Sequence, residues 1–462
     1  MNLYQEKTKY LGVFEKAEDA IQAAYLAQNE LMIKYSKKDR ESFISGIREV
    51  TLKNSELLAK MSFEETKMGR LDHKIIKHKL VAQLTPGTED LATNAWSGDD
   101  GLTLVEMAPY GVIGAVTPST NSTETIVCNS IGMIAAGNSV VFNAHPSSKK
   151  SVAYAVDMIN NVIVSKGGPE NLVTMVENPN RESLHTITNH PYIRLLCATG
   201  GPGIVKALLS SGKKAIGAGA GNPPVIVDNT ADIKSAGKNI IEGCSFDNNL
   251  PCIAEKEVFA FADIADELIH SMLENGAYLI NSRQVEQLMK IILIPQTHNN
   301  ISNTKIEYTI NKNWVGKDAK LILKELDIEV GDNISCIIME TNHDHPFVMT
   351  ELMMPVLPIV RVKDIDEAIN YAKKAEHGNR HSAHMHSKNI DNLTRFAREI
   401  DTTLFVQNGK SFAGLGFGGE GFTTFTIAGP TGEGLTSART FTRQRRCVIA
   451  KNLSIIQNPL IK

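Results

Sequence analysis

Between residues 112 and 198, short uninterrupted apolar runs alternate with amphipathic segments of helical spacing. Strands that are apolar at every position are buried on both faces, as in parallel sheets that helices cover on both sides. The alternation therefore predicts an α/β fold. The predicted strands are residues 112–116, 139–142, 172–176 and 193–198, and the predicted helices are residues 123–136, 148–165 and 181–189.

The loops after such strands are where ligands bind, because the carboxyl ends of parallel strands share one edge of the sheet. Three loops are informative here: residues 117–121, 143–146 and 199–203. A second alternating region spans residues 224–425, with predicted strands at 225–227, 257–261, 357–362 and 403–406. Helical spacing marks residues 17–32 and 38–60, and the tail 440–456 has the alternation of a strand that pairs with another sheet.

Charge and composition exclude several classes of function. The 462 residues carry a formal net charge of −3, which offers no basic field for nucleic acid. The longest apolar stretch, residues 126–142, is interrupted by two asparagines and two glycines, which argues against a membrane span. Residues 1–10 do not resemble a signal peptide. Six cysteines without CxxC spacing argue against zinc and against disulfides, and indicate a reducing, cytoplasmic setting.

Two segments in the middle of the chain carry residues suited to chemistry. Cys252 follows the polar segment 245–251, which can favour a thiolate, although a lone cysteine before a strand is more often an inert core residue. The glycine-rich segment 217–224 lets the backbone approach a ligand closely, and a tight connection between packed elements is the alternative.

Two strand ends present polar groups. The Thr-Gly-Gly-Pro-Gly segment at 199–203 can offer backbone N–H groups to a phosphate, or it can be a plain turn between strand and helix. The segment 117–121 ends in Asn121, whose amide can donate to a developing oxyanion or cap the next helix.

Four histidines lie close together in the sequence: His377, His381, His384 and His386. No carboxylate or cysteine pattern accompanies them, so we expect no metal site. One histidine poised near neutral pH can serve as a general base.

In their order along the chain, these segments resemble the aldehyde dehydrogenase superfamily. The shared features are the Pro-x-x-Asn loop at 118–121, the Ala-Gly-Asn-Ser-Val-Val stretch at 136–141, the Thr-Gly-Gly turn at 199–201, the glycine-rich loop, Cys252, and the Glu-Leu-Met-Met-Pro segment at 351–355. Within the superfamily the chain is similar to the coenzyme A-acylating branch, which includes clostridial butyraldehyde dehydrogenases and enzymes of ethanolamine and propanediol metabolism. The strings that carry this likeness are residues 117–121, 217–224, 245–249, 350–355 and 431–440.

The resemblance implies an aldehyde dehydrogenase fold: a doubly wound NAD-binding domain at 1–224 with an arm near 99–111, an α/β catalytic domain at 225–428, and a C-terminal segment at 429–462 with an oligomerisation strand. It implies reversible NAD-dependent conversion of a short aldehyde (C2–C4) and coenzyme A to acyl-CoA through a cysteine thioester. The implied catalytic residues are Cys252, Asn121 and His381. The implied cofactor-binding residues are Thr117, Pro118, His145, Pro146, Thr199, Gly200, Gly201, Gly217 and Glu351, with no metal.

Three departures from the wider superfamily matter. Hydrolytic members carry a glutamate base where this chain has Gly217, so the acyl-enzyme waits for another nucleophile, and Gly217 leaves room where a bulky acid would sit. The usual adenosine-ribose contacts fall on Asn143 and Pro146, so no carboxylate excludes NADP. The catalytic pattern begins near Leu11, so a targeting extension is short or absent.

For His381, a structural role that holds loop backbone is as good an explanation as a base. Two other functions remain open: a nucleotide-binding relative without turnover, and a hydrolytic enzyme with a displaced base. The expected assembly is a homodimer or homotetramer, with association with an alcohol dehydrogenase or enclosure in a bacterial microcompartment left open.

Overall fold

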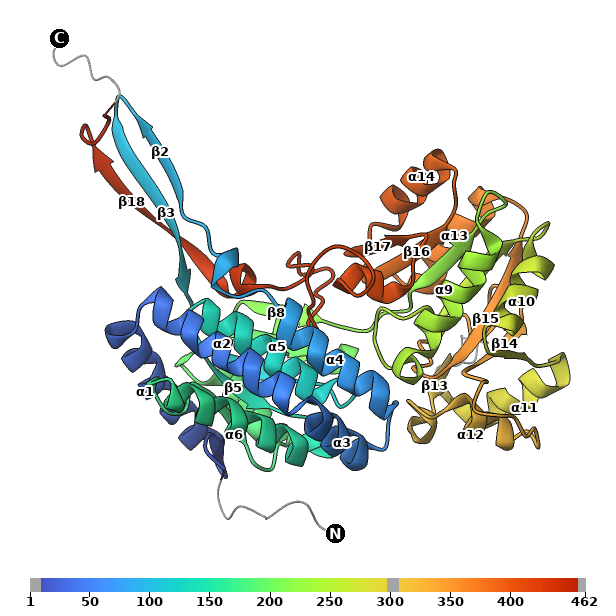
Figure 1. The fold of residues 1–462 in the computed structure, drawn as a ribbon, viewed down its shortest axis with the longest axis horizontal. Coiled ribbons are helices and arrows are strands. Elements are labelled where there is room, and N and C mark those ends of the chain that lie inside the picture. Colours follow the sequence, from blue (N-terminus) through green and yellow to red (C-terminus); the bar gives the residue numbers. More distant parts are fainter. Residues whose placement is uncertain (1–9, 297–306, 456–462) are drawn as a thin grey trace, which may run out of the picture.

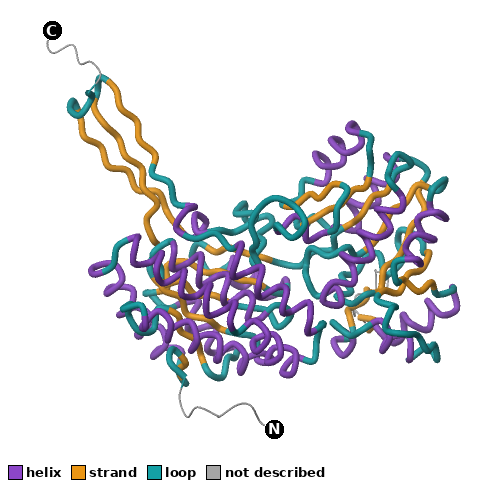
Figure 2. The backbone as a smooth tube through the Cα atoms, viewed as in Figure 1, coloured by secondary structure: helices purple, strands orange, loops and turns teal. Residues whose placement is uncertain are grey.

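The computed structural model describes residues 10–296 and 307–455, and they form two lobes and a projecting arm (Figures 1 and 2). The expectation about a targeting extension rests mostly on residues 1–9, and the tail prediction extends to Ile456, so both reach outside the described residues. Among the described residues, no helix is long and apolar enough to cross a membrane.

The first lobe contains the parallel sheet predicted from the apolar runs. Its strand order is β1-β6-β5-β4-β7-β8, and every pair is parallel. The strands are β1 (Val13–Phe14), β4 (Val112–Val116), β5 (Ser139–Asn143), β6 (Val173–Val176), β7 (Ile193–Thr199) and β8 (Ala215–Ala218). Helices α1 (Ala17–Lys34), α5 (Ser122–Ala135), α6 (Lys149–Ser165), α7 (Arg181–Asn189) and α8 (Pro202–Leu209) accompany them. The predicted α/β fold is confirmed.

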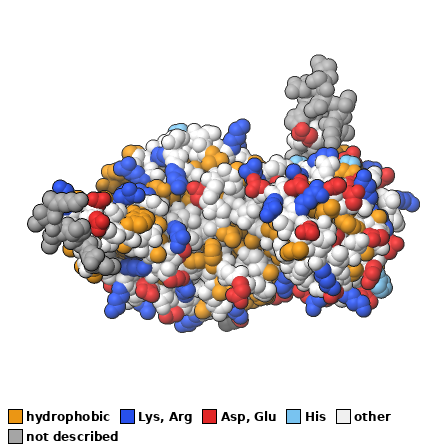
Figure 3. Space-filling view, turned by 90° about the horizontal axis from the view of Figure 1, so that it is seen from above, with side chains coloured by type: hydrophobic (Ala, Val, Ile, Leu, Met, Phe, Trp, Pro, Cys, Tyr) orange, Lys and Arg blue, Asp and Glu red, His pale blue; other side chains and the backbone are white. Residues whose placement is uncertain are grey.

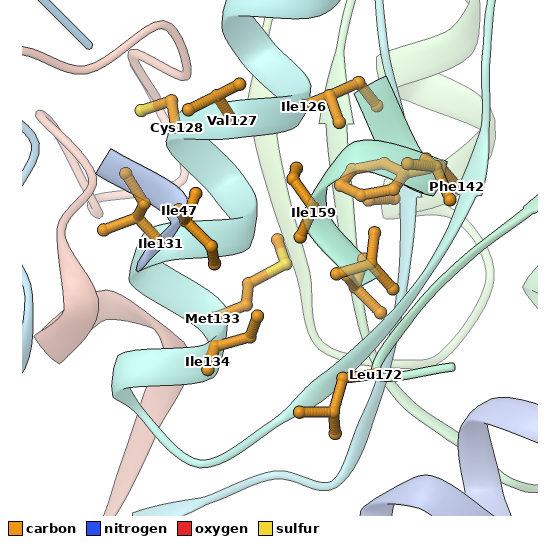
Figure 4. Packing of buried hydrophobic residues seen from close by; sticks show 14 of the residues in the cluster. Ile47, Ile126, Val127, Cys128, Ile131, Met133, Ile134, Phe142, Ile159 and Leu172 are labelled. Atoms are coloured by element: carbon orange, nitrogen blue, oxygen red, sulfur yellow. The ribbon is translucent and has the colours of Figure 1, made fainter. Parts of the chain in front are cut away.

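Helix α5 forms the centre of this lobe, because every one of its residues is buried. Figure 4 shows Ile126 of α5 near Phe142 of β5, and Ile131 of α5 next to Ile47, which reaches in from a helix of the N-terminal layer, with Ile159 of α6 between the two pairs. Burial of one such side chain stabilises the fold by about 1.5–3 kcal/mol. The packing fixes the start of α5, and with it Asn121.

The helical spacing at residues 38–60 is confirmed, and the structure divides this region into two helices, α2 (Lys37–Lys53) and α3 (Ser55–Thr66). Asn54 interrupts the helix, with φ −106° and ψ 14°, and its side chain donates to the carbonyl of Val50 (2.8 Å). Asparagine side chains compete with helical backbone bonds in this way. Helix α4 (Leu71–Leu84) follows and faces the second lobe.

The second lobe contains a parallel sheet in the order β11-β14-β15-β10-β9-β16-β17. Its strands are β9 (Pro224–Val227), β10 (Glu257–Phe261), β11 (Ala277–Leu279), β14 (Cys336–Glu340), β15 (Val356–Val362), β16 (Ser382–His386) and β17 (Leu404–Gln407). The helices are α9 (Ile233–Ser245), α10 (Ala265–Glu274), α11 (Ser282–Ile292), α12 (Ala319–Lys324), α13 (Ile365–Glu376) and α14 (Ile390–Ile400), and β12 (Leu293–Gln296) pairs with β13 (Glu307–Ile310). The four strands predicted here are confirmed; β11, β14 and β16 were not predicted.

The arm is a three-stranded antiparallel sheet in the order β18-β3-β2. It joins β2 (Asn94–Gly98) and β3 (Gly101–Pro109) to β18 (Thr442–Ala450) from the other end of the chain. The pairing of the tail with another sheet is confirmed, whereas β2 was not predicted. The arm projects away from both lobes (Figure 1), and Trp96 and Val448 on it are exposed.

Short 3₁₀ segments complete the fold: η1 (Thr88–Asp90), η2 (Pro146–Ser148), η3 (Phe246–Asn249), η4 (Lys312–Trp314), η5 (Ser411–Leu415) and η6 (Ala438–Phe441). On the face seen in Figure 3, acidic and basic side chains are interspersed across both lobes, and apolar side chains lie along the region between them.

Candidate active site

Cys252 lies just beyond η3, in the short connection that leads into β10 of the second lobe. Its side chain is partly exposed, whereas Cys128, Cys197, Cys244 and Cys336 are buried and Cys447 is exposed on the arm. A partly exposed thiol on a polar loop is the environment that a nucleophilic cysteine needs.

The loop before Cys252, residues 247–249, is held in an unusual conformation. Asp247, Asn248 and Asn249 all have left-handed backbone, with φ of 49°, 54° and 64°. Such conformations cost free energy and persist only where surrounding contacts hold them. Here the backbone N–H of Asp247 donates to His73 Nδ1 (2.8 Å), and the Asn248 and Asn249 amides donate to backbone carbonyls (3.0 and 2.9 Å).

In the free protein the Cys252 sulfur is a thiol at neutral pH. Burial raises its pKa to about 12, the carboxylate of Glu351 adds to the rise, and Lys256 opposes it. Formation of the thiolate therefore needs a proton acceptor or a change in the site's surroundings when ligands bind.

Gly221 packs between His381 and the backbone of Cys252. A Cβ on Gly221 would lie 2.8 Å from the Cys252 carbonyl oxygen and 2.9 Å from His381 Cγ. The imidazole Nδ1 pairs with Ser382 Oγ (2.7 Å), and Nε2 has no partner among the described residues. The tertiary structure thus brings His381 to the loop that carries Cys252.

The basicity expected of His381 from its ordinary pKa was wrong for the free protein. Burial, helped by the nearby ammonium of Lys256, lowers its pKa to about 4. The ring is therefore neutral at pH 7, with a free nitrogen that can accept a proton only weakly.

Two of the other three histidines of the sequence cluster bind backbone carbonyls, whereas His386 Nε2 has no partner among the described residues. His384 Nε2 bonds to the carbonyl of Ile253 (2.9 Å), and His377 Nε2 bonds to the carbonyl of Met349 (2.9 Å). Burial lowers the pKa of His384 to about 3 and that of His386 to about 4. Within residues 10–296 and 307–455, no group of three or more His, Cys, Asp or Glu side chains could hold a metal ion.

Asn121 stands at the end of β4, where α5 begins, and is 7% exposed. Its side chain forms no cap on α5; instead its Oδ1 accepts a hydrogen bond from Lys77 of α4 (2.6 Å). The alternative role of Asn121, in which its side chain caps α5, is therefore wrong.

The sequence analysis missed Lys77 and its neighbour Lys74. With His78 and Val81 they occupy positions i, i+3, i+4 and i+7 of α4, and all four side chains are fully buried. The buried face of a helix is normally apolar, so lysines at the spacing of that face are a sequence signal that could have marked Lys74 and Lys77.

A third buried lysine, Lys256, acts on the Cys252 sulfur by its charge. Lys256 Nζ donates to the backbone and side-chain oxygens of Asn249 (2.9 and 2.5 Å), and burial lowers its pKa. Around it, burial raises the pKa of Glu351 to about 6 and that of Glu257 well above its ordinary value.

The carboxyl ends of β4, β7 and β8 form an open cradle at one edge of the first sheet. A Cβ on Gly200, Gly201 or Gly203 would meet nothing within 4 Å, so these glycines face open space at the N-terminus of α8. Thr117, at the end of β4, has a buried hydroxyl without a partner among the described residues. Open glycines at a strand end and helix N-terminus, with an unsatisfied hydroxyl nearby, fit the phosphates and polar edge of a dinucleotide.

Other residues expected at the cofactor lie around this edge. Thr199 ends β7, and its hydroxyl pairs with that of Thr426 (2.9 Å). Pro118 follows Thr117 and is partly exposed, while His145 and Pro146 are exposed at the start of η2. Glu351 lies in the other lobe, in the loop that precedes β15.

Gly217 corrects one sequence expectation. It was expected to head a loop and to leave room for an acid, but it lies inside β8, beside Ala198 of β7. A Cβ there would be 2.7 Å from Val205 Cγ1 and 3.3 Å from Thr431 Cγ2. The space beside Gly217 is already filled, so that prediction was wrong.

Taken together, the site offers a thiol, a neutral imidazole on the other side of Gly221, an asparagine amide held by a buried lysine, and an open cradle at the sheet edge. A thiol near such groups can form a covalent adduct with a carbonyl carbon, and an amide can stabilise the oxyanion that results.

Known proteins with related sequences and structures agree with this chemistry. The chain is 46% identical to the acetaldehyde dehydrogenase (acetylating) EutE of Salmonella typhimurium, over 96% of this chain and 94% of that protein. A propionaldehyde dehydrogenase from the fucose utilisation microcompartment of Clostridium phytofermentans is 54% identical, with a TM-score of 0.91 over 96% of this chain and 100% of that one. A Rhodopseudomonas palustris propionaldehyde dehydrogenase, solved with bound CoA and an acylated cysteine, is 53% identical, with a TM-score of 0.91 over 96% of this chain and 99% of that one.

The family model for aldehyde dehydrogenases matches residues 10–433, which is most of the chain. With the thiol at Cys252, the open cradle and these relatives, the chain belongs to the aldehyde dehydrogenase family.

Proposed function

We propose that this protein is a coenzyme A-acylating aldehyde dehydrogenase that interconverts a C2–C4 aldehyde and its acyl-CoA. The observation that carries the proposal is a partly exposed Cys252 in a chain that has Gly217 at the position where hydrolytic members of the superfamily carry a glutamate base. A cysteine thioester that lacks a hydrolytic base persists until a thiol nucleophile arrives. The similarity to acylating relatives supports the same reaction.

Cys252 attacks the aldehyde carbon in the first step, and the carbonyl oxygen becomes an alkoxide. The Asn121 amide and the Cys252 backbone N–H are the proposed donors to that alkoxide. The thiol proton goes to His381 Nε2, whose lack of another partner supports this role. Because burial lowers the pKa of His381 to about 4, the transfer is uphill in the free protein and must be coupled to the attack.

NAD, when bound, would supply the hydride acceptor for the oxidation of the aldehyde. We assign its binding to Thr117, Pro118, His145, Pro146, Gly217, the turn at 199–201 and Glu351. The open glycines of the turn and the unpartnered Thr117 hydroxyl support this assignment. Since Asn143 and Pro146 provide no carboxylate against a 2′-phosphate, we propose that NADP also binds.

Coenzyme A completes the reaction. Its thiol attacks the thioester carbon, the new C–S bond forms, and the Cys252 thiolate leaves. We propose that His381 first releases the Cys252 proton to solvent, then accepts the CoA thiol proton and returns it to the leaving Cys252 thiolate. Run in reverse, the same residues reduce an acyl-CoA to an aldehyde.

The deciding experiment follows acyl-CoA, free acid and reduced cofactor in parallel, with C2 to C6 aldehydes and with NAD or NADP. We expect acyl-CoA to form only when CoA is present, with the highest rates at C2–C4, and we expect Cys252→Ala to abolish turnover while keeping the fold. Cys244→Ala is the matched control, because Cys244 is in the same segment but buried. Free acid formed at full rate without CoA would identify a hydrolytic enzyme instead.

We propose that the arm forms the interface between subunits of a homo-oligomer. Trp96 and Val448 are exposed on a narrow sheet that projects from both lobes, and covering them in a homodimer or homotetramer would remove apolar surface from water. We also propose a cytoplasmic setting, with enclosure in a microcompartment or association with an alcohol dehydrogenase as its finer forms. The microcompartment origin of the Clostridium phytofermentans relative supports the first of these.

A further inference from the structure

The Lys77 side chain lies at the junction of the two lobes, with three oxygen atoms around its ammonium group. It donates a hydrogen bond to Asn121 Oδ1 (2.6 Å) and forms ion pairs with Glu124 Oε1 (2.9 Å) and Asp247 Oδ2 (2.5 Å). All four side chains are nearly or fully buried. Two carboxylates therefore neutralise the ammonium, and an amide oxygen is its third neighbour.

This contact decides which way the Asn121 amide faces. An ammonium has three N–H donors and no acceptor, so only the amide oxygen can lie 2.6 Å from it. The amide nitrogen must then point to the other side, where it forms no hydrogen bond to any described residue. A flipped amide would set two donors against each other in a buried place, which costs free energy.

The same ammonium also reaches the loop that carries Cys252. Asp247 lies in the left-handed segment just before Cys252, and its other oxygen accepts the backbone N–H of Arg70 (2.7 Å). Asn121 begins α5 in the first lobe, whereas Asp247 belongs to the second. One side chain therefore connects the amide at the end of β4 to the nucleophile loop.

We propose that Lys77 is a positioning residue of the oxyanion site, which turns the Asn121 amide N–H toward the reacting carbonyl and keeps it in register with the Cys252 loop. The proposal rests on the role of Asn121 in the proposed function. Lys77 itself does not touch the substrate. Its effect is on how well the transition state is held.

Lys74 provides a matched control. It lies one turn before Lys77 on α4, is equally buried and pairs with the same Asp247 oxygen (3.3 Å), but it does not contact Asn121. Lys74→Met and Lys77→Met therefore remove the same charge from the same helix and from the same carboxylate. Only Lys77→Met frees the Asn121 amide.

The experiment measures kcat and KM per folded molecule for both variants, with and without Asn121→Ala. Because loss of one oxyanion donor lowers kcat by about 100-fold or more, we expect Lys77→Met to lower kcat by roughly tenfold to 100-fold with little change in KM. Lys74→Met should retain kcat within about threefold, and Lys77→Met should add less than about threefold in the Asn121→Ala background. Equal losses in the two lysine variants, or multiplicative losses with Asn121→Ala, would overturn the proposal.

If Lys77→Met does not fold, a charge-balanced pair gives the same answer. Lys77→Met with Glu124→Gln removes one charge of each sign and is compared with Glu124→Gln alone, which retains the contact to Asn121. The loss of kcat should appear only in the double variant, and its absence would overturn the proposal. Near-normal kcat in Asn121→Ala would instead show that the oxyanion assignment in the proposed function is wrong, whatever Lys77 does.

Discussion

Lys77 and Lys256 are both buried beside the candidate active site, but their surroundings differ. Lys77 pairs with the carboxylates of Glu124 and Asp247, and Lys74 pairs with the same Asp247, although burial lowers the pKa of Lys74. Burial alone would lower the pKa of Lys77, yet Asp247 and Glu124 outweigh it and the pKa stands above its ordinary value. Lys256 instead donates to uncharged oxygens of the nucleophile loop, and its pKa is lowered.

The carboxyl groups of the two clusters follow the same division. The pKa of Glu124 is lowered to about 2, because Lys77, His78 and Lys74 together outweigh its burial. Burial raises the pKa of Glu255 to about 7, and both oxygens of Glu257 lack a partner among the described residues. Lys74, Lys77, Glu124 and Asp247 thus form a cluster of buried ion pairs, here called the charged frame. The carboxyl groups near Lys256 instead have raised pKa values and bind protons more readily.

Asp247→Asn should break the charged frame and give the largest effect. It leaves Lys74 and Lys77 buried with only Glu124 for a counter-charge, and breaking a buried pair costs about 3–5 kcal/mol of unfolding free energy. Urea unfolding at pH 7 measures this. A cost under about 1 kcal/mol would mean that the ion pairs do not hold the frame.

Glu255→Gln should change how stability depends on pH. The pKa of Glu255 is raised from 4.5 to about 7 in the folded protein, so its contribution is fully present below pH 4.5 and is lost as pH rises to 7. The wild type should lose on the order of 3 kcal/mol across that window from this group alone. Gln can still accept the Ser411 N–H that now binds Glu255 (2.9 Å).

Unfolding curves of wild type and Glu255→Gln at pH 5, 6 and 7 test this prediction. The variant should show a flatter profile, and its stability relative to wild type should improve with rising pH. Parallel profiles would mean that Glu255 titrates normally.

Glu257→Gln should have the smallest effect, and it sharpens the contrast with Asp247→Asn. Burial raises the pKa of Glu257 well above its ordinary value, and neither carboxyl oxygen has a partner among the described residues, so the fold favours the neutral acid. Replacing a neutral acid by a neutral amide of the same size should change the unfolding free energy by less than about 1 kcal/mol. A loss as large as that of Asp247→Asn in the same urea series would show that Glu257 is charged and paired.

Much of the fold could be predicted from the sequence, because local pattern carries it. The uninterrupted apolar runs at β4, β5, β6 and β7 indicate strands buried on both faces, and the structure has them at those places. The break between α2 and α3 has a local cause as well, since the Asn54 side chain bonds back to its own helix. Hydrophobic period alone does not detect that bond.

Parts of the candidate site were also visible, but not their environments. Cys252, Asn121 and His381 stood out by motif, whereas the pKa of His381 depends on how deeply the fold buries it. The fit around Gly217 depends on Val205 and Thr431, which pack against it from α8 and from the C-terminal segment. Neither the pKa of His381 nor the packing around Gly217 can be predicted from the residues next to them in the sequence.

The sequence by itself determined the α/β class and the parallel strands, and it pointed to Cys252 as the candidate nucleophile, because periodicity and motif are properties of short segments. Only the tertiary structure decided that Lys74 meets Asp247, 173 positions away, and that Lys77 meets Asn121, 44 positions away. A buried charge is tolerated only where folding brings its partners to it. The sequence shows which residues carry charge, but only the packing of α4 between the lobes decides which of them form ion pairs and hydrogen bonds.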